Sequence, residues 1–91
     1  MALTKETVVD KIEVLEMGQV QVRTATRVLE DGVALSSSFH RHVVEPSTKS
    51  GDTWADTDIS GEDARVQAVA TATWTSDVKT AYQAMMDANE L

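Results

Sequence analysis

The dipeptide Asp31-Gly32 constrains the fold of this chain more than any other feature of its sequence. It separates two alternating runs, VQVRTATRVLE before it and VALSSSFHRHVV after it. A type I′ turn needs positive φ at both central residues, and Gly adopts this conformation without strain. The sequence therefore predicts a β-hairpin over residues 19–44.

A further strand is predicted over Thr7–Glu16, which is rich in Val and Ile. A three-residue turn at Met17-Gly18-Gln19 would join it to the hairpin and keep one apolar face, whereas a slip of one residue would turn that face to solvent. The predicted pairs across the sheet are Val14 with Val22, Ile12 with Thr24, Val8 with Val28, Val28 with Leu35, Thr24 with Phe39 and Val20 with Val43. In these pairs the apolar positions of the three strands share one face, which predicts an antiparallel meander over residues 7–45.

The polar face of this sheet is the first candidate contact surface. It is expected to carry Glu13, Arg23 and His40 in one row, with Arg27 and His42 nearby. A solvated face with an exposed Glu13–Arg23 ion pair, contributing at most about 1 kcal/mol, explains this row in structural terms. The alternative is an acidic partner that docks on Arg23, Arg27, His40 and His42.

Residues 46–59 are predicted to form a loop. Pro46 ends the third strand because its ring removes a ladder donor, and Ser, Thr, Gly and Asp follow it. A loop of about fourteen residues is long for a compact domain, and such loops are often functional. Its large apolar residue, Trp54, either packs under the sheet or anchors an interface.

The segment 60–90 is predicted to be helical. Ser60 is expected as the N-cap of a first helix, with Glu62 and Asp63 in its first turn. Thr75 or Ser76 is expected to cap a second helix, and one longer kinked helix is the alternative. The expected apolar stripes are Val66, Val69, Ala70, Thr73 and Trp74 in the first helix, and Val78, Ala81, Tyr82 and Met85 in the second.

These segments predict one α+β domain over residues 1–91. Its architecture is a three-stranded antiparallel β-meander followed by two C-terminal α-helices packed on one face. A core drawn from a chain that is 42% hydrophobic and 4% aromatic is small, so stability is expected to be marginal unless a partner contributes.

Two motifs resemble metal sites. His40 and His42 share one strand face at a spacing used for metal binding, but no third ligand accompanies them. The run Asp56-Thr-Asp58-Ile-Ser60-Gly61 matches the first half of an EF-hand loop, but Gln67 stands where the bidentate Glu belongs. We therefore predict no metal site; a weak calcium site in the Asp56/Asp58/Ser60 loop is the alternative.

Motifs for catalysis are absent from the sequence. There is no cysteine and no Gly-x-Ser-x-Gly elbow, and no glycine precedes a Lys-Ser/Thr pair. We therefore predict no catalytic residue, no cofactor and no enzymatic activity.

The net charge of -7 is unevenly distributed. Residues 1–49 hold six Lys/Arg and seven Asp/Glu, whereas residues 50–91 hold two and eight. This acidic half argues against binding to nucleic-acid phosphates. The opening MALTKETVVD lacks the pattern of a signal peptide, and no run approaches the roughly 20 apolar residues that span a bilayer. We expect a soluble protein that binds neither nucleic acid nor membrane.

Three segments carry a resemblance to a known group of proteins: MALTKETVVDKIEV, QVQVRTATRVLEDGVALSSSFHRHVVEPS and SGEDARVQAVATATWTSDVKTAY. Together they resemble small structural-module proteins of tailed phages of marine and freshwater bacteria, cyanophages included. The most recognisable part is SFHRHV, residues 38–43. The resemblance covers nearly the whole chain and implies no catalytic residue.

The resemblance implies a structural component of a virion, because genes of this kind tend to lie among virion genes. We expect an accessory protein that docks on the capsid or on the tail and its fibres, present in multiple copies or as a homo-oligomer, with other virion proteins as partners. The expected contact residues are Trp54, Arg23, Arg27, His40 and His42. The alternative is a small intracellular module that acts on a host protein.

Overall fold

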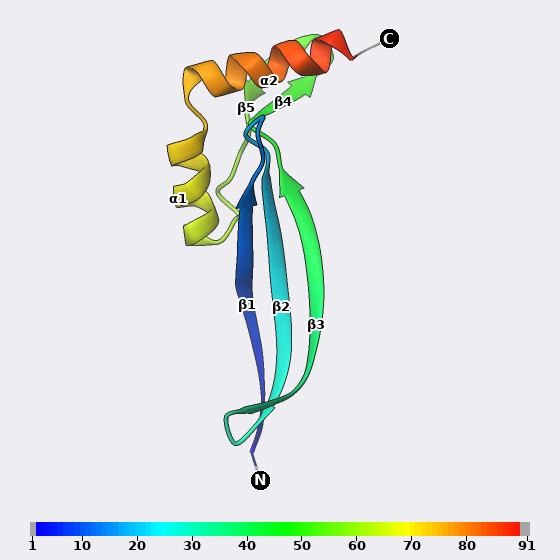
Figure 1. Cartoon of the computed structure of the whole chain (residues 1–91), viewed down its shortest axis with the longest axis vertical. Coiled ribbons are helices and arrows are strands. Elements are labelled where there is room, and N and C mark those ends of the chain that lie inside the picture. The colour runs from blue at the N-terminus through cyan, green and yellow to red at the C-terminus, as the bar shows by residue number, and fades with distance from the viewer. Residues whose placement is uncertain (1, 90–91) are drawn as a thin grey trace.

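Three long strands form the main sheet of the computed structural model, which describes residues 2–89. β1 spans Leu3–Val14, β2 spans Val20–Glu30 and β3 spans Val33–Val44, and they pair antiparallel in the order β1-β2-β3 (Figure 1). The predicted meander is confirmed. The molecule is elongated, with extents of 56 × 27 × 22 Å, because these strands are 11 or 12 residues long and lie along its axis.

The remaining elements gather at one end of the sheet. A short hairpin of β4 (Ser47–Ser50) and β5 (Thr53–Asp56) precedes α1 (Ala64–Thr73) and α2 (Ser76–Ala88) (Figure 1). The α+β class, with a three-stranded antiparallel sheet followed by two C-terminal helices, is therefore confirmed. The other end of the sheet extends beyond the helices.

The β4–β5 hairpin lies within residues 46–59, which the sequence predicted to be a loop. Its strands are four residues long and rich in Ser, Thr and Asp, so they lack the apolar alternation that marks a strand. Lys49 pairs with Trp54 across the hairpin, and Gly51 enters its turn with φ of +62°. Packing against α2, rather than its own composition, stabilises this hairpin.

The β1–β2 turn lies one residue earlier than predicted, and the predicted pairs are wrong. Leu15 N–H donates to Gln19 O (2.8 Å) and Gly18 N–H donates to Leu15 O (3.0 Å). A β-bulge also leaves Asp10 without a partner on β2. Instead of Val14 with Val22, Ile12 with Thr24 and Val8 with Val28, the pairs are Val14 with Val20, Ile12 with Val22 and Val8 with Ala25.

The turn at Asp31-Gly32 is confirmed, with φ of +50° and +85° at its two residues. A second bulge, at Leu35, then shifts the register of β3 by one residue. The predicted pairs Val28–Leu35, Thr24–Phe39 and Val20–Val43 are therefore wrong, and the observed pairs are Val28–Ser36, Thr24–His40 and Val20–Val44. Because strand side chains alternate, this shift exchanges the two faces of β3.

The core lies between α1 and the adjacent end of the main sheet. Val66, Ala70 and Trp74, three members of the predicted helical stripe, are buried against β2 and β3. Their partners on the sheet are Val20, Val22 and Val44. The Trp74 indole N–H donates to the Gly18 carbonyl (2.7 Å), so the polar atom of this buried ring is satisfied.

Both helices begin at side-chain caps. Asp63, and not Ser60 as predicted, caps α1 by accepting a hydrogen bond from Arg65 N–H (2.9 Å). Residues 60–62 form a turn before the helix. Thr75 caps α2 by accepting from Val78 N–H (3.3 Å), with Asp77 in the first turn, as predicted.

α2 packs on the β4–β5 hairpin. Tyr82 is buried, and its ring meets the Trp54 ring edge-on with 6.0 Å between centroids. Gln83 Nε2 donates to Ser47 Oγ (3.1 Å), and Lys49 Nζ lies 3.0 Å from Asp87 Oδ1. The helices therefore consolidate one end of the molecule and leave the rest of the main sheet uncovered (Figure 1).

Substitution of Gly18 tests this packing. A Cβ there would lie 2.5 Å from Val78 Cγ1, in a backbone with φ of +89°. We expect Gly18→Ala to lower the free energy of unfolding by about 3 kcal/mol, since left-handed backbone strain adds to overpacking. Gly32→Ala is the matched control because Gly32 has φ of +85° but open space around it, and we expect it to cost about 1 kcal/mol. Urea unfolding measures both, and equal losses would contradict the Gly18–Val78 contact.

Candidate functional site

The candidate site is the face of the main sheet that points away from α1. We call it the open face and define it by Arg23, Ala25, Phe39, Arg41 and Val43, which the strand register places on one side. Phe39 and Val43 keep 50% and 53% of their surface exposed, whereas the small Ala25 opposite Phe39 is fully buried. Two large apolar side chains thus remain about half exposed on this face.

Arg23 organises the centre of the open face. Its Nε donates to Asp10 Oδ1 (2.9 Å) and its Nη2 donates to Asp10 Oδ2 (2.8 Å), which is a bidentate ion pair. The same guanidinium lies over the Phe39 ring, 4.6 Å from the centroid. The β1 bulge makes this arrangement, because it removes Asp10 from the ladder beside Arg23.

A row of three cations crosses the sheet at the level of Arg23. The register aligns Lys11, Arg23 and Arg41 on neighbouring strands. Asp10 pairs with Arg23, and Glu13 lies 2.6 Å from Lys11, so the predicted Glu13–Arg23 pair is wrong. Arg41 has no ion-pair partner among residues 2–89 and is exposed.

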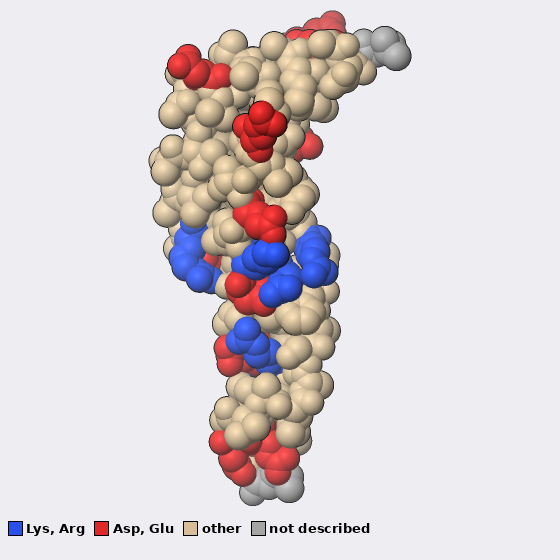
Figure 2. Space-filling model, in the orientation of Figure 1, with Lys and Arg blue, Asp and Glu red and all other residues tan. Residues whose placement is uncertain are grey.

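Figure 2 shows the Lys and Arg side chains gathered across the middle of the long sheet, between acidic side chains at its far tip and at the helical end. A hollow of about 160 Å³ opens in this basic band. Its lining residues are Lys11, Glu13, Gln21, Val22, Arg23, Arg41, His42 and Val43. Its mixed apolar and cationic lining suits an acidic side chain with an apolar neighbour.

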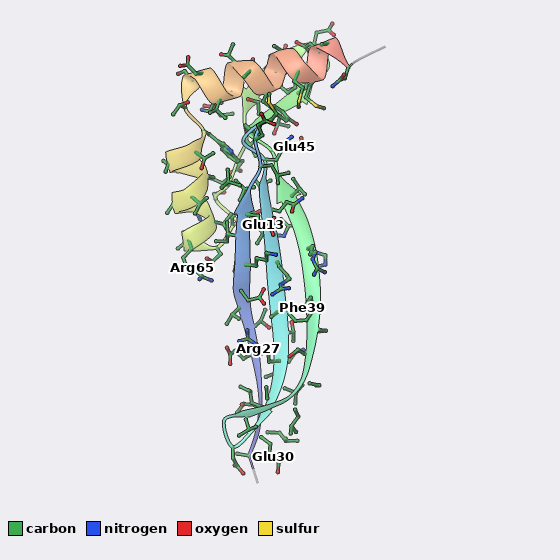
Figure 3. All side chains as sticks on the ribbon, viewed as in Figure 1. Glu13, Arg27, Glu30, Phe39, Glu45 and Arg65 are labelled. Atoms are coloured by element: carbon green, nitrogen blue, oxygen red, sulfur yellow. The ribbon has the colours of Figure 1, made fainter. Side chains whose placement is uncertain are left out.

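The structure does not bring the predicted contact residues together. Arg23 and Arg27 lie on the open face, and Arg27 Nη1 pairs with Glu6 Oε1 (3.1 Å). The Leu35 bulge turns His40 and His42 to the side that carries α1. The interpretation of these four residues as one surface is therefore wrong. Figure 3 shows Glu13, Arg27 and Phe39 along the sheet, with Glu30 at its tip.

Trp54 lies apart from the open face and does not pack under the main sheet. It is half-buried on the β4–β5 hairpin, where its Nε1 donates to Asp87 Oδ2 (3.3 Å) and Lys49 Nζ lies 5.5 Å from its ring centroid. Hydrogen bonds from Lys49 and Trp54 lower the pKa of the Asp87 carboxyl. Burial, reinforced by a hydrogen bond to Glu45, raises the pKa of Tyr82 to about 12. Through its contacts with Asp87 and Tyr82, Trp54 thus joins the β4–β5 hairpin to α2.

The residues of the two metal-like motifs are engaged with other groups. The His40 and His42 rings stack with 6.3 Å between centroids, and His42 Nε2 lies 2.8 Å from Glu62 Oε1. Asp56 pairs with Lys79 (2.9 Å), and Asp58 accepts from Ser60 N–H (2.9 Å), a bond that lowers the Asp58 pKa. Within residues 2–89, no three His, Cys, Asp or Glu side chains are grouped to hold a metal ion.

Sequence reasoning missed Asp10, Arg41 and Val43 as residues of the site. Asp10 and Arg41 were overlooked because the β-bulges that place them carry no local composition signal. Val43 was assigned to the core face for the same reason.

No protein-family model matches this chain, and no curated protein or solved structure matches it significantly. Over the described part of the chain, neither helix has the length and apolar character needed to cross a membrane. The open face is the surface on which a functional proposal is built below.

The Asp10–Arg23 pair gives a prediction about acid stability. The hydrogen bond from Arg23 holds the pKa of Asp10 below its ordinary value of 3.8. A depressed folded-state pKa stabilises the fold above the unfolded-state pKa, and this stabilisation is lost as the pH falls through the folded-state value. We therefore expect Asp10→Asn to flatten the decline in unfolding free energy as the pH falls below about 4.

Urea unfolding across that pH range measures this effect. Asp52→Asn, in the exposed turn between β4 and β5, is the control and should leave the decline unchanged. A parallel titration of the Asp10 carboxyl by NMR should give a higher midpoint in Arg23→Gln. An unaltered midpoint would contradict the bidentate pair.

Proposed function

We propose that this chain is a non-enzymatic structural component of a tailed-phage virion that docks on the capsid or on the tail and its fibres. The docking role is supported by the sheet, which extends past the helices (Figure 1). Phe39 and Val43 lie half exposed on its open face. The phage setting is supported by the resemblance of the segments VQVRTAT, EDG and SFHRHV.

The open face offers the chemistry of an interface centre. Aromatic residues and arginine, here Phe39 and Arg41, are enriched at protein interfaces. Burying Phe39 against a partner contributes about 2 kcal/mol, and Arg41 adds a charge-assisted hydrogen bond if the partner supplies a carboxylate. The fitting partner surface is apolar at its centre and acidic at its rim.

The proposed role also accounts for the small core. Few residues are fully buried between α1 and the sheet, and the far part of the sheet is covered by nothing in residues 2–89. Binding to a scaffold stabilises such a fold by mass action, because the partner binds only the folded state. In a virion, weak contacts of this kind act together over many copies.

Mass spectrometry of purified particles from the phage that encodes the chain tests the proposal. We expect the chain in the particles at a fixed copy number. We expect Phe39→Ser and Val43→Ser to reduce incorporation about tenfold, since each removes an apolar contact. Met86→Ser is the matched control because Met86 is also exposed but lies on α2, and it should incorporate normally.

Circular dichroism of each purified variant separates loss of docking from loss of folding. Absence of the chain from particles would contradict the virion role and favour the module that acts on a host protein. Normal incorporation of folded Phe39→Ser and Val43→Ser would show that the open face is not the docking surface.

A further inference from the structure

The two edges of the main sheet differ in how they are protected. Edge strand β1 carries a bulge at Asp10, and its Val9 carbonyl accepts a hydrogen bond from Arg65 Nη2 at the start of α1. It also bears frequent charges: Lys5, Glu6, Asp10, Lys11 and Glu13. Charges, bulges and covering groups are the devices that prevent one sheet from adding to another.

Edge strand β3 lacks most of these devices. Residues 33–39, VALSSSF, carry no charge, and every one of them is exposed. Within the part of the chain that the structure describes, β2 is the only strand paired with β3, so its outer N–H and C=O groups face solvent. An exposed uncharged edge of this length is a template for another strand.

The sequence of this edge is nearly symmetric about Ser37. In LSSSF, a serine triplet is flanked by Leu35 and Phe39. Two copies of β3 that run antiparallel about a two-fold axis at Ser37 place Leu35 of one copy opposite Phe39 of the other, and Ser36 opposite Ser38. An interface of this kind is self-complementary, because the same residues meet from both sides.

We infer that β3 pairs with β3 of a second copy of this chain, antiparallel about Ser37. The two main sheets then form one continuous sheet of about six strands, which lies within the usual range. The open faces of the two copies join into one surface. This inference does not require the virion role, although Phe39 takes part in both proposed contacts.

The charges along the molecule favour this partner. The two-fold axis at Ser37 brings the acidic tip of one copy, with Glu30 and Asp31, to the level of Arg41 in the other copy. Arg41 has no ion-pair partner within residues 2–89 of its own chain. The acidic tip and the basic band of one chain (Figure 2) thus each approach the opposite charge of the second copy, although each chain has a net charge of -7.

The bulge at Leu35 defines how far the pairing extends. It bends β3 toward the tip, so the closest pairing is expected between Leu35 and Phe39. Small serine side chains at the centre let the two backbones approach without steric conflict. The exposed Leu35 and Phe39, at 57% and 50%, gain cover from each other.

Sedimentation equilibrium tests the inference through edge substitutions. We expect the unmodified protein to sediment at twice the 9.9 kDa of one chain. We expect Ser37→Lys to weaken the dimer at least about tenfold, because two like charges would face each other at the axis. Thr7→Lys is the matched control, since Thr7 is also exposed in the middle of an edge strand, and it should leave the dimer intact.

Single cysteines locate the axis, because the chain has no cysteine of its own. Directly opposed strand residues lie about 4.5–5.5 Å apart between Cα atoms, which suits a disulfide bond. Under mild oxidation we expect Ser37→Cys to form a linked dimer. A mixture of Ser36→Cys and Ser38→Cys should give mainly the mixed dimer, and Thr7→Cys should stay unlinked.

The outcomes that would overturn the inference are distinct from loss of folding, which circular dichroism monitors in each variant. A protein that sediments as a monomer at all concentrations would overturn it. So would a dimer that survives Ser37→Lys, or linkage of Thr7→Cys as rapid as that of Ser37→Cys.

Discussion

The buried contact between Trp74 and Gly18 joins the helical end of this molecule to its sheet. The indole nitrogen donates to the Gly18 carbonyl at 2.7 Å, and the ring lies among Val20, Val22 and Val66 in the core cluster. Gly18 has positive φ, and a Cβ there would lie 2.5 Å from Val78 Cγ1, so the start of α2 packs on this turn because glycine stands there. The position of α1, and through it the start of α2, follows from this contact.

The contacts that stabilise the molecule are distributed unevenly along its length. At the helical end, apolar side chains from strands and helices exclude water together, whereas the far end depends on backbone pairing and on cross-strand pairs such as Arg27–Glu6. Leu3, Val33 and Leu35 are exposed, so their apolar surface adds nothing to the area buried in the small core. Of these residues, Leu35 gains cover in the proposed pairing of β3 with a second copy.

Much of the fold follows from short sequence signals. Asp31-Gly32 fixed the hairpin, the apolar stripe fixed which side of α1 is buried, and Thr75 fixed the start of α2. These signals are local, since a turn residue, a helical period or a cap acts within a few positions.

The candidate site was less accessible from sequence because it depends on two β-bulges. Each bulge adds one residue to a strand, and one residue is enough to exchange its faces. Phe39 and Val43 therefore lie on the open face, and His40 and His42 lie on the other. The β4–β5 hairpin was missed for a different reason, since its stability comes from α2 and not from its own polar strands.

The separation along the chain between Gly18 and Trp74 has a consequence for how the protein folds. The two hairpins of the main sheet close through neighbouring segments, so they form early at little cost in loop entropy. The contact that completes the core closes a span of 56 residues. During synthesis the sheet therefore emerges with Val20 and Val22 still exposed to water. The core is complete only when the Trp74 ring packs against them.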